Sequence, residues 1–188
     1  MDTPAGDAVP AALFHYSEEP GIAHFEPRPS KHHPYSAVWA VEASCAVNLI
    51  LPRDCPRVTF GVGSYTSLDD VARWMGDATA RRIVAIEAGW IDRVRACTLH
   101  EYAMPLATFV LDDVHAGYYI SRTAVRPLAC RVITDVLAEL LAHQAEVRVM
   151  PSLWRLRDQV AASSLRFSII RMNKAQPPND GYEPVFPV

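Results

Sequence analysis

Apolar and polar residues alternate in several short segments of the chain, which is the pattern of half-buried β-strands. In residues 13–17, alternation places Leu13 and His15 on one face and Phe14 and Tyr16 on the other, before Pro20-Gly21 ends the strand. Further strands are predicted at 37–41, 58–60, 82–87, 95–102, 117–127, 146–150 and 165–172.

A period of three to four residues predicts a small number of helices. Ser67 is a helix N-cap followed by two acids, and Gly76 ends that helix. Residues 132–143 show the clearest helical pattern, and residues 153–160 show another. Many short strands with few helices predict an α+β domain of mainly antiparallel strands with a few flanking helices, and not a doubly wound sheet.

The length of 188 residues, half of them hydrophobic, suits a single compact domain. Residues 1–10 are small and polar, and we expect a flexible N-terminal arm there. The domain is predicted over residues 11–173, and residues 174–188 form a Pro-rich tail. We expect the two ends to contribute little to the stability of the fold.

Charge and cysteine usage exclude several classes of protein. The formal charge of −3 gives no reason to expect non-specific nucleic-acid binding. No run of eighteen apolar residues suggests a membrane span, and the N-terminus lacks the features of a secretory signal. The cysteines show no Cys-x-x-Cys spacing, and the absence of such pairs is typical of free thiols in a reducing compartment. We therefore expect a cytoplasmic protein, and we expect no metal site. The cysteines are Cys45, Cys55, Cys97 and Cys130.

The motifs of the common nucleotide-binding and hydrolytic enzymes are missing. Gly61-Val62-Gly63 lacks the third glycine of the dinucleotide fingerprint. Gly-x-Ser-x-Gly, His-Glu-x-x-His and Gly-Lys-Ser do not occur. Function must therefore be sought in other polar residues.

The first group of candidate binding residues lies at the mouth of the first strand, where His15, Tyr16 and Ser17 meet a turn. Arg28 lies in a proline-rich loop and Arg53 lies between Pro52 and Pro56, and guanidinium groups in such loops could bind a phosphate. A packing role for His15, simple exposure of Arg28 and an ion pair of Arg53 with Asp54 are the structural alternatives.

A second group, Ser121 and Arg122 with Tyr119, repeats the combination of a tyrosine and a serine on a strand. We expect it to form the second wall of a cleft that opens at His15. A ligand in that cleft would meet aromatic, hydroxyl and cationic groups together.

Four motifs resemble those of an uncharacterised bacterial protein family over residues 13–177. They are Phe-His-Tyr-Ser, Pro-Arg-Asp-Cys-Pro-Arg, Gly-Tyr-x-x-Ser-Arg and Met-Pro-Ser-Leu-Trp, at 14–17, 52–57, 117–122 and 150–154. This resemblance implies no activity.

The first strand also resembles the first motif of the ADP-ribosyltransferase fold, in which a strand histidine contacts NAD. The resemblance implies that His15 contacts NAD, that Tyr118 or Tyr119 stacks on nicotinamide and that Glu87 or Glu101 supplies the acid. Of these we select His15, Tyr119 and Glu101 as catalytic candidates. A carboxylate would offset the positive charge that develops on ribose when the bond to the base breaks.

Two functions follow from these expectations. The first is an enzyme that binds NAD or a related nucleotide and cleaves or transfers at a ribosyl-base bond. The second is a non-catalytic module on the same fold that binds a small molecule or a protein. The sequence leaves the oligomeric state open.

Overall fold

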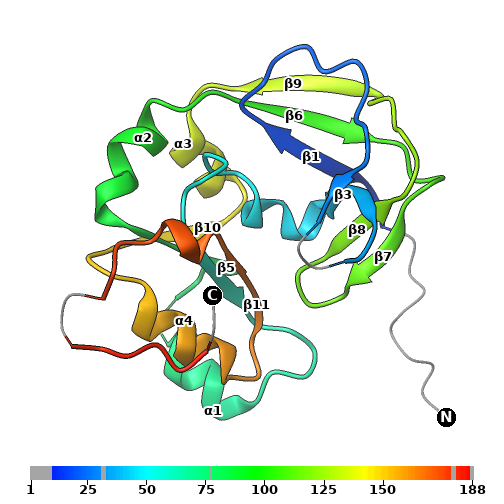
Figure 1. The fold of residues 1–188 in the computed structure, drawn as a ribbon. Coiled ribbons are helices and arrows are strands. Elements are labelled where there is room, and N and C mark those ends of the chain that lie inside the picture. Colours follow the sequence, from blue (N-terminus) through cyan, green and yellow to red (C-terminus); the bar gives the residue numbers. More distant parts are fainter. Residues whose placement is uncertain (1–9, 31–32, 77, 179–180, 187–188) are drawn as a thin grey trace, which may run out of the picture.

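Two β-sheets form the framework of the computed structural model, which describes residues 10–30, 33–76, 78–178 and 181–186 (Figure 1). The first sheet has the order β7-β8-β3-β1-β6-β9, with β2 paired to β3, and the second has the order β10-β5-β4-β11. The strands of the first sheet are β1 (Leu13–Ser17), β2 (Arg28–Pro29), β3 (Ser36–Glu42), β6 (Leu99–Met104), β7 (Val110–Asp113), β8 (Tyr118–Ser121) and β9 (Ala129–Ile133). Those of the second are β4 (Arg57–Gly61), β5 (Arg82–Glu87), β10 (Ala145–Met150) and β11 (Arg166–Ile170).

Neighbouring strands are antiparallel except for β10 and β5, which run parallel. A parallel pair needs a crossover connection. Here the chain between β5 and β10 forms strands β6 to β9 of the first sheet before it returns to the second. The protein is a single α+β domain with mainly antiparallel strands, as the sequence predicted.

The helices are short. They are η1 (Ala43–Asn48), α1 (Leu68–Asp70), η2 (Val71–Met75), η3 (Ala88–Trp90), α2 (Ile91–Arg95), α3 (Val136–Ala142), α4 (Trp154–Ala161) and η4 (Met172–Lys174). The predicted cap is confirmed, because the Ser67 side chain accepts a hydrogen bond from the Asp70 N–H. No helix in the described part of the chain is long and apolar enough to cross a membrane.

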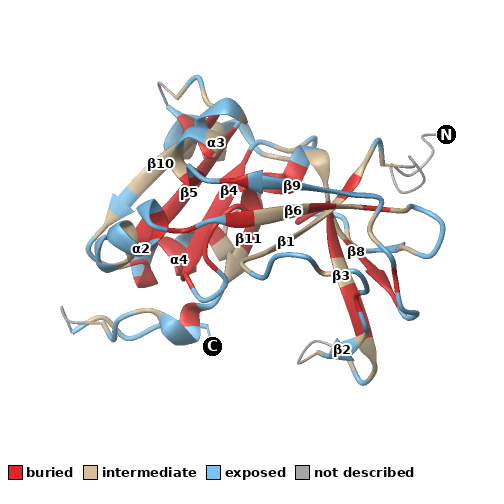
Figure 2. Ribbon diagram, turned by 90° about the horizontal axis from the view of Figure 1, so that it is seen from above, coloured by how far each residue is buried: buried red, intermediate tan, exposed pale blue. Residues whose placement is uncertain are grey.

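Buried residues form three clusters. One lies where η1, α2 and α3 pack on β5, and it includes Ile50, Val84 and Leu140. A second packs α4 on the other face of the second sheet around Phe60, and a third covers one face of the first sheet around Phe25. Figure 2 shows the buried residues concentrated in β4 and β5, whereas β9 at a sheet edge is mostly exposed.

The segment predicted as the clearest helix is divided between a strand and a helix. Its first two residues, Val132 and Ile133, belong to β9, and Ile133 pairs with Leu99 on β6. The helix α3 begins only after Asp135, whose side chain accepts a hydrogen bond from the Ala138 N–H. Strand pairing therefore overrides the apolar period here. The strand predicted from residue 95 likewise begins at Leu99, because α2 continues to Arg95.

The C-terminal segment, predicted as a Pro-rich tail that contributes little to the fold, contacts the domain at several points. The Gln176 N–H donates to Glu87 Oε2 (3.0 Å), and Trp154 Nε1 donates to the Gln176 carbonyl (2.7 Å). Further along, the Tyr182 hydroxyl donates to Asp158 Oδ2 (2.6 Å). The segment is thus fastened to α4 and β5. Of the expected N-terminal arm, residues 1–9 lie outside the described residues.

Candidate functional site

His15 lies on β1, between β3 and β6 in the first sheet. The backbone of β1 pairs with β3 at Leu13 and Phe14. Beyond them the contact with β3 is made by the His15 side chain, whose Nδ1 lies 2.7 Å from the Trp39 carbonyl oxygen. The ring also packs on Phe25, with 4.6 Å between the ring centres. Because a carbonyl only accepts, Nδ1 carries the proton and Nε2 of the neutral ring is left as an acceptor.

The environment of His15 favours its neutral form. Burial lowers the pKa of His15 below its ordinary value of 6.5, the hydrogen bond to Trp39 opposes this, and repulsion from Arg53 and Arg28 lowers it further. The repulsion also reveals that these two arginines lie within electrostatic reach of the imidazole. We call His15 and the two arginines whose charges act on it the β1 site.

Arg28 and Arg53 are both exposed, Arg28 on β2 and Arg53 in the loop that precedes β4. Within the described residues, neither guanidinium group forms a hydrogen bond or ion pair. The predicted pair of Arg53 with Asp54 is replaced by an ion pair of Asp54 with Arg171 (3.7 Å). Both guanidinium groups at the β1 site are therefore available to an anionic ligand.

Arg57 explains how the loop that carries Arg53 is held. Its side chain is buried and donates to three backbone carbonyls, those of Asn48 (2.8 Å), Pro52 (3.2 Å) and Cys55 (3.0 Å). The carbonyls of the loop consequently turn inward. The second arginine of the Pro-Arg-Asp-Cys-Pro-Arg motif is structural, and the first is left exposed near His15.

Tyr16 and Glu101 lie on the opposite face of the sheet from His15. Tyr16 pairs with Glu101, and His15 pairs with the next residue along β6, so the two pairs point to opposite sides. The Tyr16 hydroxyl donates to Glu101 Oε2 (2.7 Å), and Arg131 donates to both Glu101 oxygens at 2.9 Å. The carboxylate selected as the catalytic acid is thus already bound and does not face His15.

The remaining predicted residues have partners of their own. The Ser17 hydroxyl accepts from the Glu19 N–H (3.0 Å) and so closes the turn after β1. Tyr119 is buried in the core, and the buried Ser121 hydroxyl donates to Thr108. The guanidinium of Arg122 lies over the ring of Tyr35, which stacks on His33 and through it on Trp39.

These contacts place Arg122 away from the β1 site. Within β3, Trp39 points to the face opposite that of Ala40, and Ala40 shares the face of His15. Arg122 belongs to the stack on the Trp39 side. Arg122 therefore does not form a wall that faces His15. Arg28 pairs with Ala37, which by alternation shares the face of Trp39, so Arg28 acts on His15 through its charge and not as a neighbour on the same face.

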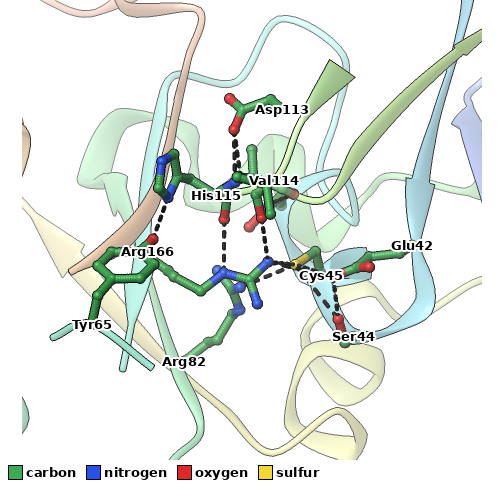
Figure 3. Close-up of polar contacts among 11 residues, drawn as sticks. Glu42, Ser44, Cys45, Tyr65, Arg82, Asp113, Val114, His115 and Arg166 are labelled. Carbon is green, nitrogen blue, oxygen red and sulfur yellow. Dashed lines mark hydrogen bonds and ion pairs between the residues drawn. The ribbon is translucent and has the colours of Figure 1, made fainter. Parts of the chain in front are cut away.

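A second polar group, which the sequence analysis missed, lies where the two sheets meet (Figure 3). Arg82 Nη2 and Arg166 Nη2 donate to the same sulfur, Cys45 Sγ, at 3.0 and 3.2 Å, and Glu42 lies 3.4 Å from Arg166. We call these four residues the arginine cluster. One signal for it exists in the sequence, since alternation in the apolar strand 82–87 directs Arg82 to the same face as Val84.

The lowered pKa of His15 predicts a pH effect on stability. Because the pKa of His15 in the folded state lies below 6.5, the unfolded chain binds a proton at a higher pH than the folded chain does. The free energy of unfolding therefore falls as the pH drops below 6.5. The slope from this residue is at most about 1.4 kcal/mol per pH unit. Urea unfolding between about pH 7.5 and 5.5 should show this loss in the natural protein and less of it in His15→Gln. Equal pH dependence of His15→Gln and of the exposed control His24→Gln would contradict it.

Among the described residues, no three His, Cys, Asp or Glu side chains lie together as a metal site would require.

Comparison with known proteins shows a family but no individual relative. No curated protein and no solved structure matches the chain. A family of unknown function, DUF6886, matches residues 14–175, which is most of the chain. The protein belongs to this uncharacterised family, DUF6886.

Proposed function

We propose that the protein binds a nucleotide of the NAD class at the β1 site and acts on the bond between ribose and base. The observation that carries the binding part is that two guanidinium groups without a partner among the described residues lie close enough to His15 to lower its pKa. Arginine is well suited to phosphate oxygens, which accept paired hydrogen bonds from its planar group.

The state of His15 supports a hydroxyl contact. With Nδ1 held by Trp39, Nε2 is a fixed acceptor that would bind a ribose hydroxyl, while Arg28 and Arg53 bind the pyrophosphate. We propose this division of contacts for the sugar and phosphates of one nucleotide. The catalytic part of the proposal depends on the resemblance of the first strand to ADP-ribosyltransferases.

One observation favours the second candidate function, a binding module without catalysis. Glu101, the acid selected from the sequence, accepts from Arg131 and Tyr16 on the other face of the sheet. A carboxylate held in this way would have to leave Arg131 before it could stabilise a ribosyl cation. Binding and turnover must therefore be measured separately.

We expect NAD and ADP-ribose to raise the melting temperature of the protein and nicotinamide alone to leave it unchanged, because the phosphates provide the main contacts. In Arg28→Gln/Arg53→Gln, the affinity for ADP-ribose measured by calorimetry should fall by about tenfold or more. Arg95→Gln is the matched control, since Arg95 is exposed on α2 and its ion pair with Asp92, at 3.9 Å, is loose. Equal affinity of the double variant and the control would contradict nucleotide binding at this site.

Release of nicotinamide from NAD separates the two candidate functions. An enzyme should release it, and release should fall in Arg28→Gln/Arg53→Gln together with nucleotide binding. Binding without any release would identify the module.

A further inference from the structure

The arginine cluster begins with a row of residues across three strands of the second sheet. Gly61 on β4 pairs with Arg82 on β5 on one side and with Arg166 on β11 on the other. All three share one face of the sheet, and the residue between the two arginines has no side chain. The two guanidinium groups can therefore reach the same point above the sheet.

That point is the sulfur of Cys45, toward which both guanidinium groups extend in Figure 3. Arg166 has strong acceptors besides the sulfur, since it donates to the carbonyls of Val114 (2.9 Å) and His115 (3.0 Å) and lies 3.4 Å from Glu42. Arg82 has none among the described residues. It is only 8% exposed, its Nη2 meets the sulfur, and its Nη1 is buried with no hydrogen-bond partner.

The charges of the cluster do not balance. Burial raises the pKa of the Cys45 thiol, and the guanidinium groups offset only part of this, so the sulfur is uncharged at neutral pH. Burial also acts to raise the pKa of Glu42, but hydrogen bonds from Ser44, Cys45 and Arg166 keep it below its ordinary value. One carboxylate thus faces two cations, the buried Arg82 and the half-buried Arg166.

The other carboxylate in Figure 3 does not correct the imbalance. Asp113 accepts from the backbone N–H groups of His115 (2.8 Å) and Ala116 (3.0 Å), and from neither guanidinium. A buried cation without an anionic or carbonyl partner is costly. A bound anion would remove that cost.

We propose that the arginine cluster binds a phosphate group, with Arg82 Nη1 as its principal donor and Arg166 as the second cation. A phosphate supplies several acceptor oxygens in a compact group and so matches converging guanidinium donors. This site is separate from the β1 site and does not depend on the proposed function.

Two glycines and an exposed pair of side chains complete the site. A Cβ at Gly63 would lie 2.6 Å from Arg166 Cγ, and one at Gly117 would lie 2.7 Å from Cys45 Sγ, so larger residues would push the cluster apart. Tyr65 and His115 are exposed and bonded to each other beside Arg166. They mark the side from which a phosphate would enter.

The first test compares thermal melting of the natural protein and Arg82→Met in phosphate-free buffer and with added inorganic phosphate. Without phosphate, Arg82→Met should melt at the same temperature as the natural protein or higher, because the substitution removes an unbalanced buried cation. Phosphate should raise the melting temperature of the natural protein and leave that of Arg82→Met unchanged. Equal shifts in both proteins, or no shift in either, would overturn the proposal.

The second test cannot be confused with misfolding, because it predicts a gain. Glu42→Gln keeps an acceptor for Ser44 and removes the nearby negative charge, so phosphate should bind about three- to tenfold more tightly by calorimetry. Unchanged or weaker binding would count against the site. The control Arg28→Gln/Arg53→Gln should bind inorganic phosphate as the natural protein does, and loss of binding there would assign the phosphate to the β1 site instead.

A further arm distinguishes the source of the phosphate group. Arg82-dependent stabilisation by AMP at lower concentrations than inorganic phosphate would identify a nucleotide as the ligand. The reverse order would identify free phosphate. Either result supports the phosphate site. The comparison is made in the Arg28→Gln/Arg53→Gln background, which removes the β1 site, and stabilisation by AMP that is independent of Arg82 in that background would contradict the proposal.

Discussion

Asp158→Asn is expected to lower the free energy of unfolding by about 3–5 kcal/mol, because it removes one partner of a buried ion pair. Asp158 Oδ1 lies 2.7 Å from Arg157 Nε, and both side chains are only 5% exposed. The same carboxylate accepts from the Tyr182 hydroxyl and from the Val185 N–H (2.7 Å). The substitution therefore removes the carboxylate of a buried ion pair and weakens the attachment of the C-terminal segment.

Urea unfolding measures this effect, with Asp92→Asn as the control. Asp92 is 96% exposed and lies 3.9 Å from Arg95, so its replacement should change the free energy of unfolding by less than about 1 kcal/mol. If the two variants are equally stable, the C-terminal segment and the ion pair beneath it contribute little, as first expected from the sequence.

Arg57→Met should be similarly destabilising, by about 3 kcal/mol or more. The substitution keeps much of the volume but removes the donors of three carbonyls, and each unsatisfied buried acceptor costs about 1–3 kcal/mol. The loss of a buried charge offsets part of this cost. Denaturant unfolding checks the value, and Arg95→Met is the exposed control.

Arg57→Met should also disturb ligand binding at a distance. With its carbonyls released, the loop of residues 52–56 would no longer hold Arg53 near His15, so any stabilisation by ADP-ribose should weaken in molecules that are still folded. A variant that is as stable as the natural protein would show that water replaces the guanidinium contacts at no cost.

Strands with a clear alternation of apolar and polar residues could be predicted from the sequence. β1, β3, β5 and β10 lie within a residue or two of their predicted positions. β7 and β9 were missed, because Val110–Asp113 and Ala129–Ile133 are mostly exposed edge strands with little apolar patterning. Their strand conformation comes from pairing with β8 and β6, which is not a local property.

The candidate site was predictable only in part, for the same reason. His15 followed from a local motif, and Arg28 and Arg53 from proline-bounded loops that display their side chains. Glu101 was selected without knowledge of the register, and pairing with Tyr16 turns it to the other face of the sheet. A shift of one residue in register reverses the face of every side chain in a strand.

The sequence by itself determined the α+β class, most strands, the Ser67 cap and the exposed position of the first arginine of the Pro-Arg-Asp-Cys-Pro-Arg motif, since each depends on residues close together in the chain. Only the tertiary structure decided which polar groups meet. Arg82 and Arg166 are 84 positions apart in the sequence, and Cys45 is even more distant from Arg166. Gly61 nevertheless pairs with both arginines and so aligns them on one face of the sheet. Such meetings depend on strand order and register, which arise from packing between distant segments.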